Sequence, residues 1–332
     1  MTSGGPVLIT GGSGFIGSYV ARMLLEQGRT VVDFDPSPLS PQTRFVLGPL
    51  ADQLIYEQGG VDNWGRLFDV IQRHRPSTIV HAGAIVNTAW LLKNPIPAFH
   101  VNLGGTINVL EASRLLDVGR VVLISSIGVL PTKQYEPIDV NHPLILAREG
   151  PASGFYGAAK VGSEAFGFCY QVSFGIDFRV VRPSAPYGLA MGWPMFVKTM
   201  VEGAVNGEPV RFATGGPFPR SYTHIEDCAS LIVAVVDAPD DSDHVFYAAN
   251  GEPLTTAARV AEIVRELVPG ADIEIGGQLS EADHYELNMR GILSVENARQ
   301  QLGWKPQYTD MREGVAEYLD RYRAFVASGA AH

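Results

Sequence analysis

Short apolar runs alternate with longer segments of helical periodicity through the first half of the chain. Runs rich in valine, isoleucine and leucine, typical of buried strands, lie at 6–10, 30–35, 77–84, 120–126 and 177–184. Residues 15–28 instead carry apolar side chains at helical spacing and end at a glycine, as an amphipathic helix does. Repeated strand–helix alternation implies right-handed crossovers between parallel strands. The pattern therefore predicts an α/β fold with a Rossmann-type, doubly wound parallel sheet.

The character of the chain changes after Pro183. Gly- and Pro-rich segments are interleaved there with scattered helical patterns such as 255–270. At 332 residues the chain is also long for one compact core. We therefore expect a first domain over 1–184 and a smaller, mixed α/β C-terminal lobe over 185–332. Segments near 223–250 are expected to return to the first domain.

Composition and charge restrict the kinds of partner. Hydrophobic residues make up 46% of the chain and charged residues 18%, an ordinary mix for a globular protein. The net charge of −10 and the lack of basic runs argue against nucleic acids and anionic membranes as partners. The sequence shows no secretory signal pattern and no run of about 18 apolar residues, so a cytoplasmic protein is expected. Cys169 and Cys228 are accordingly expected to be free thiols.

Three glycines, Gly11, Gly14 and Gly17, directly follow the first predicted strand and open the first predicted helix. Without Cβ atoms a turn can be tight, and a phosphate group can approach the backbone. The helix start adds unpaired N–H groups and a positive dipole end, and the last glycine allows close helix–strand packing. A glycine triplet alone could be a turn without a ligand. Its place between strand and helix indicates that the 1–184 domain binds a dinucleotide.

Asp35 ends the second predicted strand, about 20 residues after the glycines. A carboxylate at this place accepts hydrogen bonds from the ribose hydroxyls of a dinucleotide. Its charge would repel the 2′-phosphate of NADP, and no arginine adjoins it, so NAD is the expected cofactor. Asp33, two residues earlier on the same face, is either a second such carboxylate or a solvated group at the strand end.

Tyr156 and Lys160 stand four residues apart in a segment of helical character, so they share one helix face. An ammonium group beside a phenol lowers the pKa of the phenol. Such a phenol can remove the proton of a carbinol while hydride passes to a nicotinamide. Ser126 ends a predicted strand at the sheet edge where ligands bind in open α/β sheets, and its hydroxyl can hold the same oxygen. For the pair alone, the alternative is a surface tyrosine beside a solvated lysine.

Taken together, these motifs resemble the extended short-chain dehydrogenase/reductase family, which includes nucleotide-sugar epimerases and dehydratases. The matching segments cover nearly the whole chain in order. They are 10–17 (TGGSGFIG), 81–84 (HAGA), 102–114 (NLGGTINVLEASR), 124–126 (ISS), 156–160 (YGAAK), 182–188 (RPSAPYG), 220–229 (RSYTHIEDCA) and 294–306 (SVENARQQLGWKP).

The resemblance implies roles for individual residues. The catalytic residues would be Ser126, Tyr156 and Lys160. Cofactor contacts would come from Gly11, Gly14, Phe15, Ile16, Gly17, Asp35, Leu50, Ala82, Gly83, Ala84, Asn102, Ser125, Tyr156, Lys160, Pro183 and Ser184. Substrate contacts would come from Ser126, Tyr156, Ala185, Arg220 and Arg290, which makes the C-terminal lobe the substrate-binding one. No metal is expected. In this family the helix of Tyr156 and its neighbour pair with a second subunit, so a homodimer is expected.

Several departures from the family pattern limit which activities of the family the chain can have. Dehydratase and decarboxylase members carry acidic residues just after the catalytic hydroxyl, whereas Ile127 and Gly128 follow Ser126 here. Pro49 stands where the family often has an aspartate that accepts from the adenine amine. Ala185 stands where nucleotide-sugar members have an asparagine that contacts the diphosphate. Arg220 and Arg290 keep the positions of diphosphate-binding arginines, a role that suits the guanidinium fork.

Several other residues invite a functional interpretation. His81 is expected to be a packed, hydrogen-bonded histidine, and His224 and His284 have no companions at metal-ligand spacing. Cys169 and Cys228 are expected to pack in a core or an interface. The helical stripe of Phe166, Cys169, Tyr170 and Phe174 is expected to be helix packing. The segment 191–200 (MGWPMFVKTM) either lines a substrate pocket or fills the small lobe.

Three functions are compatible with these observations. The first is an NAD-dependent sugar epimerase that oxidises a carbinol to a ketone and returns the hydride to the other face, with a nucleotide-linked sugar as substrate. The second is a net NAD-dependent dehydrogenase or reductase of a small hydroxy acid, sugar or other non-nucleotide alcohol. The third is a dinucleotide-binding sensor or scaffold, against which the serine, tyrosine and lysine set argues.

Overall fold

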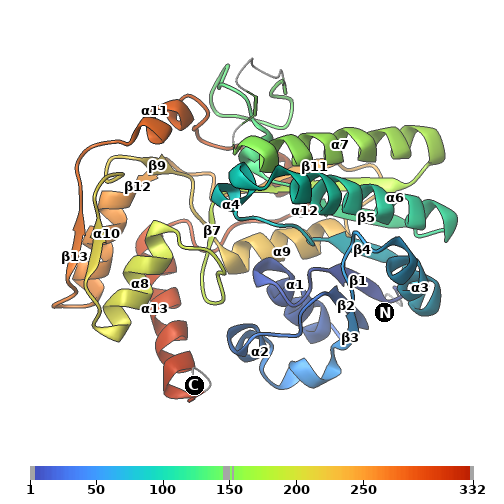
Figure 1. Ribbon diagram of the computed structural model, residues 1–332, viewed down its shortest axis with the longest axis horizontal. Coiled ribbons are helices and arrows are strands. Elements are labelled where there is room, and N and C mark those ends of the chain that lie inside the picture. Colours follow the sequence, from blue (N-terminus) through green and yellow to red (C-terminus); the bar gives the residue numbers. More distant parts are fainter. Residues whose placement is uncertain (1–3, 145–149, 152, 330–332) are drawn as a thin grey trace.

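A seven-stranded parallel sheet forms the centre of the computed structural model, which describes residues 4–144, 150–151 and 153–329 (Figure 1). The strand order is β11-β6-β5-β4-β1-β2-β3, and every neighbouring pair is parallel. The strands are β1 (Val7–Thr10), β2 (Val31–Asp35), β3 (Ile55–Gln58), β4 (Thr78–His81), β5 (Arg120–Ile124), β6 (Asp177–Pro183) and β11 (Val245–Ala248). The predicted doubly wound parallel sheet is confirmed.

Helices cover both faces of this sheet, and alternate strand residues face each layer. In β1, Val7 and Ile9 belong to one hydrophobic cluster and Leu8 to the other. The first layer holds α1 (Phe15–Glu26), α2 (Pro41–Leu47) and α9 (Ile225–Val236). The second holds α3 (Trp64–His74), α6 (Gly105–Leu115) and α7 (Gly154–Phe174). Residues buried on both faces explain why most of these strands are uninterrupted apolar runs.

The C-terminal part of the chain builds a smaller lobe beside the carboxyl end of the sheet (Figure 1). Its helices are α8 (Phe196–Asn206), α10 (Ala257–Leu267), α11 (Glu281–Leu287) and α13 (Met311–Ala327), while α12 (Glu296–Leu302) contacts α9 and β11. Its short strand pairs are β8 (Val210–Phe212) with β13 (Ile273–Ile275), β9 (Pro219–Arg220) with β12 (Thr255–Thr256), and β7 (Pro186–Tyr187) with β10 (Thr223–His224). The remaining helical segments are η1 (Gly48–Gln53), α4 (Thr88–Lys93), α5 (Pro95–Pro97), η2 (Ala98–Gly104) and η3 (Ile127–Val129).

All five predicted strands are present, and each is shorter than predicted: β1, β2 and β4 begin one residue later, and β4, β5 and β6 end earlier. The strand predicted over 77–84 ends at His81, and the three residues that follow leave the sheet. Strand β3 was not predicted, because its sequence IYEQ is short, polar and mostly exposed at the sheet edge. Strand β11, which pairs with β6, comes from the segment 223–250.

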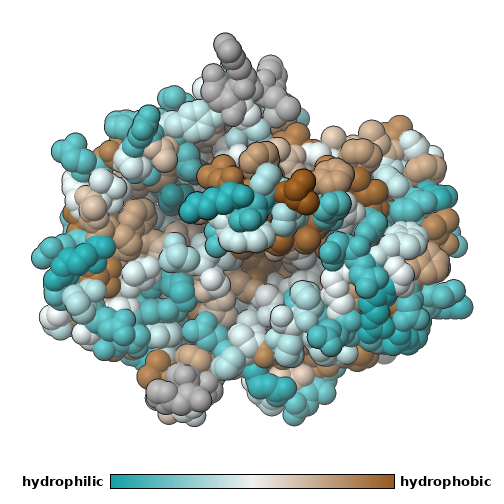
Figure 2. All heavy atoms as spheres, viewed as in Figure 1, coloured by the Kyte–Doolittle hydropathy of each residue, from teal (hydrophilic) through white to brown (hydrophobic). Residues whose placement is uncertain are grey.

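The aromatic stripe on α7 does not pack as predicted within one chain. Phe166 and Phe174 are 46% and 55% exposed, and Cys169 is exposed as well. Cys228, in contrast, is fully buried in α9. Figure 2 shows apolar residues gathered on the surface over α4 and α7. Because α7 covers the sheet with only one of its faces, its outward residues remain uncovered in the single chain.

No helix in the described part of the chain is both long and apolar enough to cross a membrane.

Candidate active site

The glycine-rich turn between β1 and α1 is shaped by close backbone contacts. Gly11 has a φ of 76°, and a Cβ there would lie 2.8 Å from the backbone nitrogen of Gly83. A Cβ at Gly17 would overlap the carbonyl oxygen of Gly11. Helix α1 begins at Phe15 without a side-chain cap, so its first N–H groups remain available at this turn. The turn therefore has the backbone donors and the close helix packing that a diphosphate site requires.

A cleft of about 610 Å³ runs along this turn and the carboxyl ends of β2 and β4, within the usual range of about 300–1,000 Å³ for small-molecule sites. Predicted cofactor residues in its lining are Gly11, Gly14, Phe15, Ile16, Gly17, Asp35, Ala82, Gly83 and Ala84. Residues of the lining that were not predicted include Phe34, Pro36, Ser40, Thr43, Gly59, Gly60, Val61, Asp62 and Val86. Most of these residues come from the segments that follow β2 and β3, while Phe34 lies in β2 and Val86 follows β4; none belongs to a motif that the sequence showed.

Asn102 and Leu50 are among the predicted cofactor residues that lie outside the lining of this cleft. Asn102 is fully buried, and its side-chain amide exchanges hydrogen bonds of 2.7 and 3.0 Å with the backbone N–H and carbonyl of Ile85. It therefore shapes the loop that borders the cleft. Leu50 packs against the hydrophobic core from η1.

The two aspartates of β2 have different surroundings. Asp35 lines the cleft and accepts a hydrogen bond of 2.9 Å from the backbone N–H of Ser37. Partial burial raises the pKa of Asp35. Asp33 is fully buried and accepts a hydrogen bond of 2.6 Å from the Ser13 hydroxyl. The alternative of a solvated Asp33 is therefore wrong, because the glycine-rich turn covers it.

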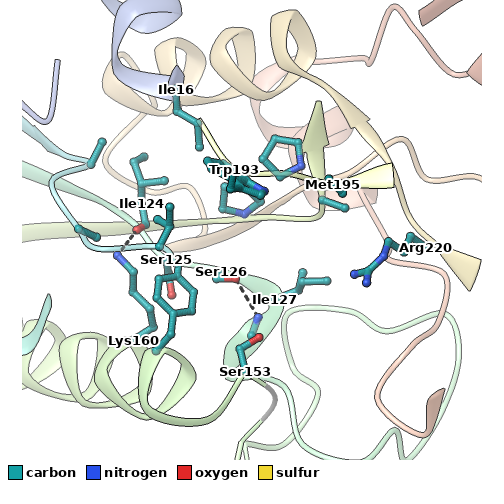
Figure 3. A pocket seen from close by; sticks show the side chains of 18 of the residues that line it. Ile16, Ile124, Ser125, Ser126, Ile127, Ser153, Lys160, Trp193, Met195 and Arg220 are labelled. Atoms are coloured by element: carbon teal, nitrogen blue, oxygen red, sulfur yellow. Dashed lines mark hydrogen bonds between the residues drawn. The ribbon is translucent and has the colours of Figure 1, made fainter. Parts of the chain in front are cut away.

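A second pocket adjoins the cleft and contains Ser126, Tyr156 and Lys160 (Figure 3). Ser126 follows β5 and accepts a hydrogen bond of 2.9 Å from the backbone N–H of Gly128. Tyr156 and Lys160 come from the first turns of α7, and the ammonium group lies 5.8 Å from the centre of the Tyr156 ring. The cleft and the pocket share Ile16, Ala82, Ala84, Val86 and Trp193. The three predicted catalytic residues therefore lie together in a pocket at the end of this cleft.

The expected lowering of the Tyr156 pKa by Lys160 is not found. Burial raises the pKa of Tyr156 to about 12, against a hydrogen bond with Ser126 that lowers it. Burial also lowers the pKa of Lys160 to about 8, against the charge of Glu164 that raises it. Lys160 donates a hydrogen bond of 2.7 Å to the carbonyl of Ile124, as the dashed line in Figure 3 shows. Burial is therefore the dominant influence at the phenol, and it outweighs the hydrogen bond with Ser126.

A buried ion pair lies close to Lys160, behind the pocket. Arg182 of β6 donates to both carboxylate oxygens of Glu164, with nitrogen–oxygen distances of 3.0 and 2.6 Å. The Ser125 hydroxyl donates to the same carboxylate at 2.5 Å. Ser125 lines the catalytic pocket, but its hydroxyl is engaged in this network. Neither Glu164 nor Arg182 was singled out from the sequence, because their pairing joins residues on different elements.

The two predicted substrate arginines lie at the end of the pocket away from Lys160, where Figure 3 shows Arg220. The guanidinium carbons of Arg220 and Arg290 lie 4.6 and 5.7 Å from the centre of the Phe218 ring. Burial, followed by the charge of Arg220, lowers the pKa of Arg290, although Arg290 pairs with Glu286. Within the part of the chain that the structure describes, the Nε atoms of both arginines are buried without a hydrogen-bond partner. Two adjacent cations with unused donors form a site for an anion that carries more than one charge.

Of the remaining predicted site residues, some line the pocket and others are buried in the core. Pro183 and Ala185 line the pocket, whereas Ser184 is buried and donates a hydrogen bond of 2.7 Å to the carbonyl of Ser221. Both interpretations of 191–200 hold for different residues. Trp193 and Met195 line the pocket, and Figure 3 shows them along one wall, while Met191, Val197 and Met200 are buried in the core.

His81 is packed and hydrogen-bonded, as predicted. Its ring nitrogens lie 2.7 Å from the Thr10 hydroxyl and 3.0 Å from the Thr106 hydroxyl. Burial lowers the pKa of His81 to about 3, so the ring is neutral. Among the described residues, no group of three or more His, Cys, Asp or Glu side chains is arranged to hold a metal ion.

Comparison with known proteins agrees with this geometry. The model of the NAD dependent epimerase/dehydratase family matches residues 7–249. The UDP-glucose 4-epimerase of Mycolicibacterium smegmatis is 26% identical over 95% of this chain and 98% of its own length. The dTDP-glucose 4,6-dehydratase of the same organism is 23% identical over 96% of this chain and 93% of its own. The structure of the UDP-glucose 4-epimerase of Thermotoga maritima with UDP-glucose superposes with a TM-score of 0.83 at 23% identity, covering 97% of this chain and 99% of that one.

Proposed function

The chain belongs to the NAD-dependent epimerase/dehydratase family, and we propose from this premise that it is a nucleotide-sugar epimerase acting through a transient ketone. One observation carries the proposal. Ser126, Tyr156 and Lys160 lie between the cleft at the glycine-rich turn and the paired cations Arg220 and Arg290. A substrate whose diphosphate binds the arginines can thus place a sugar carbinol at the catalytic residues and next to the cofactor cleft.

The cleft has the features that NAD requires. The amides at the start of α1 would bind its diphosphate, and Asp35 would accept from a ribose hydroxyl. The nicotinamide end would reach the region where the cleft and the catalytic pocket join. Oxidised nicotinamide, when bound, supplies a hydride acceptor and a positive charge.

The chain's own residues handle the proton of the substrate hydroxyl. The Ser126 hydroxyl orients that oxygen, and the Tyr156 oxygen takes its proton and later returns it. With a pKa of about 12 in the free protein, Tyr156 needs nearby positive charge to act as a base near neutrality. Lys160 is one source of that charge while it is protonated, below a pH of about 8. An epimerase uses this exchange in both directions, so the ketone is reduced again before release.

The arginine pair limits which substrates fit the site, and the residues after Ser126 limit which reactions it can catalyse. Two adjacent guanidinium groups with buried, unpartnered Nε atoms fit a diphosphate better than a single carboxylate. Ile127 and Gly128 offer no acid to expel water from the sugar, which favours epimerisation over the 4,6-dehydration named for one relative. The names of the other two relatives point to UDP-glucose and its 4-position.

We also propose that the enzyme is a homodimer. The exposed apolar residues Leu92, Ile96, Phe99, Phe166 and Phe174 lie on the segment 88–104 and on α7, and burying them against a second copy would stabilise the pair. A cytoplasmic location remains a prediction, which cell fractionation tests.

The test is to denature the purified protein, assay released NAD, and incubate the intact enzyme with UDP-glucose or UDP-galactose under nuclear magnetic resonance. We expect tightly bound NAD and interconversion of the epimers without net formation of NADH. Arg220→Ala should raise the KM for the UDP-sugar by about tenfold or more, since a hydrogen bond to a charged group contributes about 1.5–3 kcal/mol. Arg220→Lys is the control that keeps the charge.

Three results would contradict the proposal. An enzyme that is purified empty and reduces added NAD with a free sugar or hydroxy acid would be a net dehydrogenase. An Arg220→Ala enzyme with an unchanged KM would exclude a diphosphate at the arginine pair. A protein that binds NAD but turns over no alcohol would be a sensor.

A further inference from the structure

Asp33 is a carboxylate in the interior of the protein, directly beneath the dinucleotide-binding turn. It lies in the middle of β2 between Val32 and Phe34, pairs in register with Ile9 of β1 and Tyr56 of β3, and is 0% exposed. Ionised groups are rarely buried without a cation, because they lose the solvation of water. Among the described residues, Asp33 has no ion-pair partner.

The contacts of Asp33 are with the turn itself. Its Oδ2 accepts a hydrogen bond of 2.6 Å from the hydroxyl of Ser13, and its Oδ1 is buried with no hydrogen-bond partner among the residues described. A Cβ at Gly12 would overlap Oδ1, so the carboxyl group packs directly against the backbone of Gly12. Gly12 and Ser13 are the two residues between Gly11 and Gly14, the residue that precedes the start of α1 at Phe15. The carboxyl group therefore supports the part of the chain that faces the cofactor diphosphate.

The charges around Asp33 disfavour its ionised form. Asp35 adds negative charge from the same strand, and Tyr56 is the titratable group on β3. Next to Asp33, β1 contributes Ile9, and the turn contributes the uncharged Gly12 and Ser13. Burial raises the pKa of Asp33 to about 7. The Ser13 hydroxyl lowers this pKa, the charge of Asp35 raises it, and the backbone N–H groups of Ser13 and Gly12 lower it by smaller amounts. Near neutral pH, the free protein therefore holds both forms of this carboxyl group.

We propose that Asp33 positions the dinucleotide turn as a neutral acid and that NAD binding is coupled to uptake of a proton by Asp33. This inference rests on the proposed binding of NAD at the turn. A bound diphosphate brings two further negative charges to the other side of the Gly12–Ser13 backbone, which disfavours an ionised Asp33. The protonated protein therefore binds NAD more tightly, and the ionised protein must first take up a proton. By linkage, each change affects the other equally.

The predicted pH dependence has a definite sign. Below the pKa of Asp33 in the free protein, the carboxyl group is already neutral and the Kd for NAD is constant. Above this pKa, most of the protein must bind a proton before NAD, so the Kd rises, with a limiting slope of about tenfold per pH unit. The rise ends where Asp33 ionises in the complex as well.

Isothermal titration calorimetry with NAD tests this inference on the full-length protein. NAD previously bound to the protein is removed first, and each titration is run between about pH 6 and pH 8.5 in two buffers that differ in ionisation enthalpy. We expect the heat to depend on the buffer at neutral and alkaline pH, showing proton uptake, and the Kd to rise there. Asp33→Asn, which is nearly isosteric and always neutral, should bind NAD with a Kd that no longer varies with pH and without this uptake.

Two further variants separate Asp33 from other groups. Ser13→Ala removes the hydrogen bond that favours the ionised carboxylate, so the rise in Kd should begin at a higher pH. Asp35→Asn should weaken NAD binding but retain the proton uptake. If circular dichroism shows that Asp33→Asn does not fold, the shift in the pH dependence of Ser13→Ala tests the role of Asp33 instead.

Specific results would overturn the inference. They are a wild-type Kd that is constant with pH and independent of buffer, a pH dependence that survives in Asp33→Asn, or an unshifted onset in Ser13→Ala. Any of these would leave the proposed epimerase intact. If the wild-type protein binds no NAD at any pH, the proposed function itself fails.

Discussion

Replacing Glu164 with glutamine removes one charge from the buried ion pair with Arg182 and keeps the shape of the side chain. The two side chains are only 3% and 4% exposed, so water cannot solvate the guanidinium once its partner is neutral. Glu164→Gln also presents an amide nitrogen toward a donor group, either the Arg182 guanidinium or the Ser125 hydroxyl. Breaking a buried ion pair by removing one partner costs about 3–5 kcal/mol. We expect the free energy of unfolding to fall by about this amount.

Urea unfolding, followed by tryptophan fluorescence and circular dichroism, measures this loss. The matched control is the double variant Glu164→Leu, Arg182→Met, which removes both charges and should recover much of the loss, because apolar replacement of a buried pair is often neutral. A loss below about 1 kcal/mol in Glu164→Gln would refute the reasoning. So would a double variant whose loss equals the sum of the two single losses.

The same substitution should also change the pH dependence of the catalytic rate. The charge of Glu164 raises the pKa of Lys160 against the stronger effect of burial, which leaves that pKa at about 8. Without this charge, Lys160 deprotonates at a lower pH, and a rate that requires the ammonium form should decline at a lower pH too. If the rate of Glu164→Gln declined at the same alkaline pH as the rate of the wild-type enzyme, Glu164 would have no effect on the pKa of Lys160.

Further predictions concern the catalytic residues and the cofactor. Tyr156→Phe should lower kcat by at least about 10²-fold, as expected for loss of a general base, with NAD affinity nearly unchanged by calorimetry; wild-type turnover would remove the phenol from the mechanism. In the wild-type enzyme, kcat should fall as the pH rises above about 8, because Lys160 then loses its proton; a constant rate up to about pH 10 would contradict this assignment. Asp35→Ala should weaken NAD binding and reduce the preference for NAD over NADP, as measured by the ratio of the two Kd values; an unchanged ratio would mean that another group selects the cofactor.

Much of the fold could be predicted because its signals are local. Strands buried on both faces are apolar runs, so β1, β2, β4, β5 and β6 were found from the sequence. Edge strand β3 was missed, since a strand that is exposed at the sheet edge has no such pattern. What covers the outward side of α7 could not be predicted, because periodicity shows which residues share a face but not what packs against that face.

The sequence by itself determined the parts of the site that depend on spacing along one element. The glycines at the start of α1, the Tyr156–Lys160 pair on α7 and the carboxyl-end position of Ser126 all follow from local geometry. Tertiary structure alone decided how charges behave, because burial and partners come from segments far apart in the chain. It placed Asp33 beneath the turn, joined Glu164 to Arg182, and raised the pKa of Tyr156 where a neighbouring lysine had predicted the opposite. The free energy of a charge depends on its solvation and on all groups around it, and a linear sequence records neither.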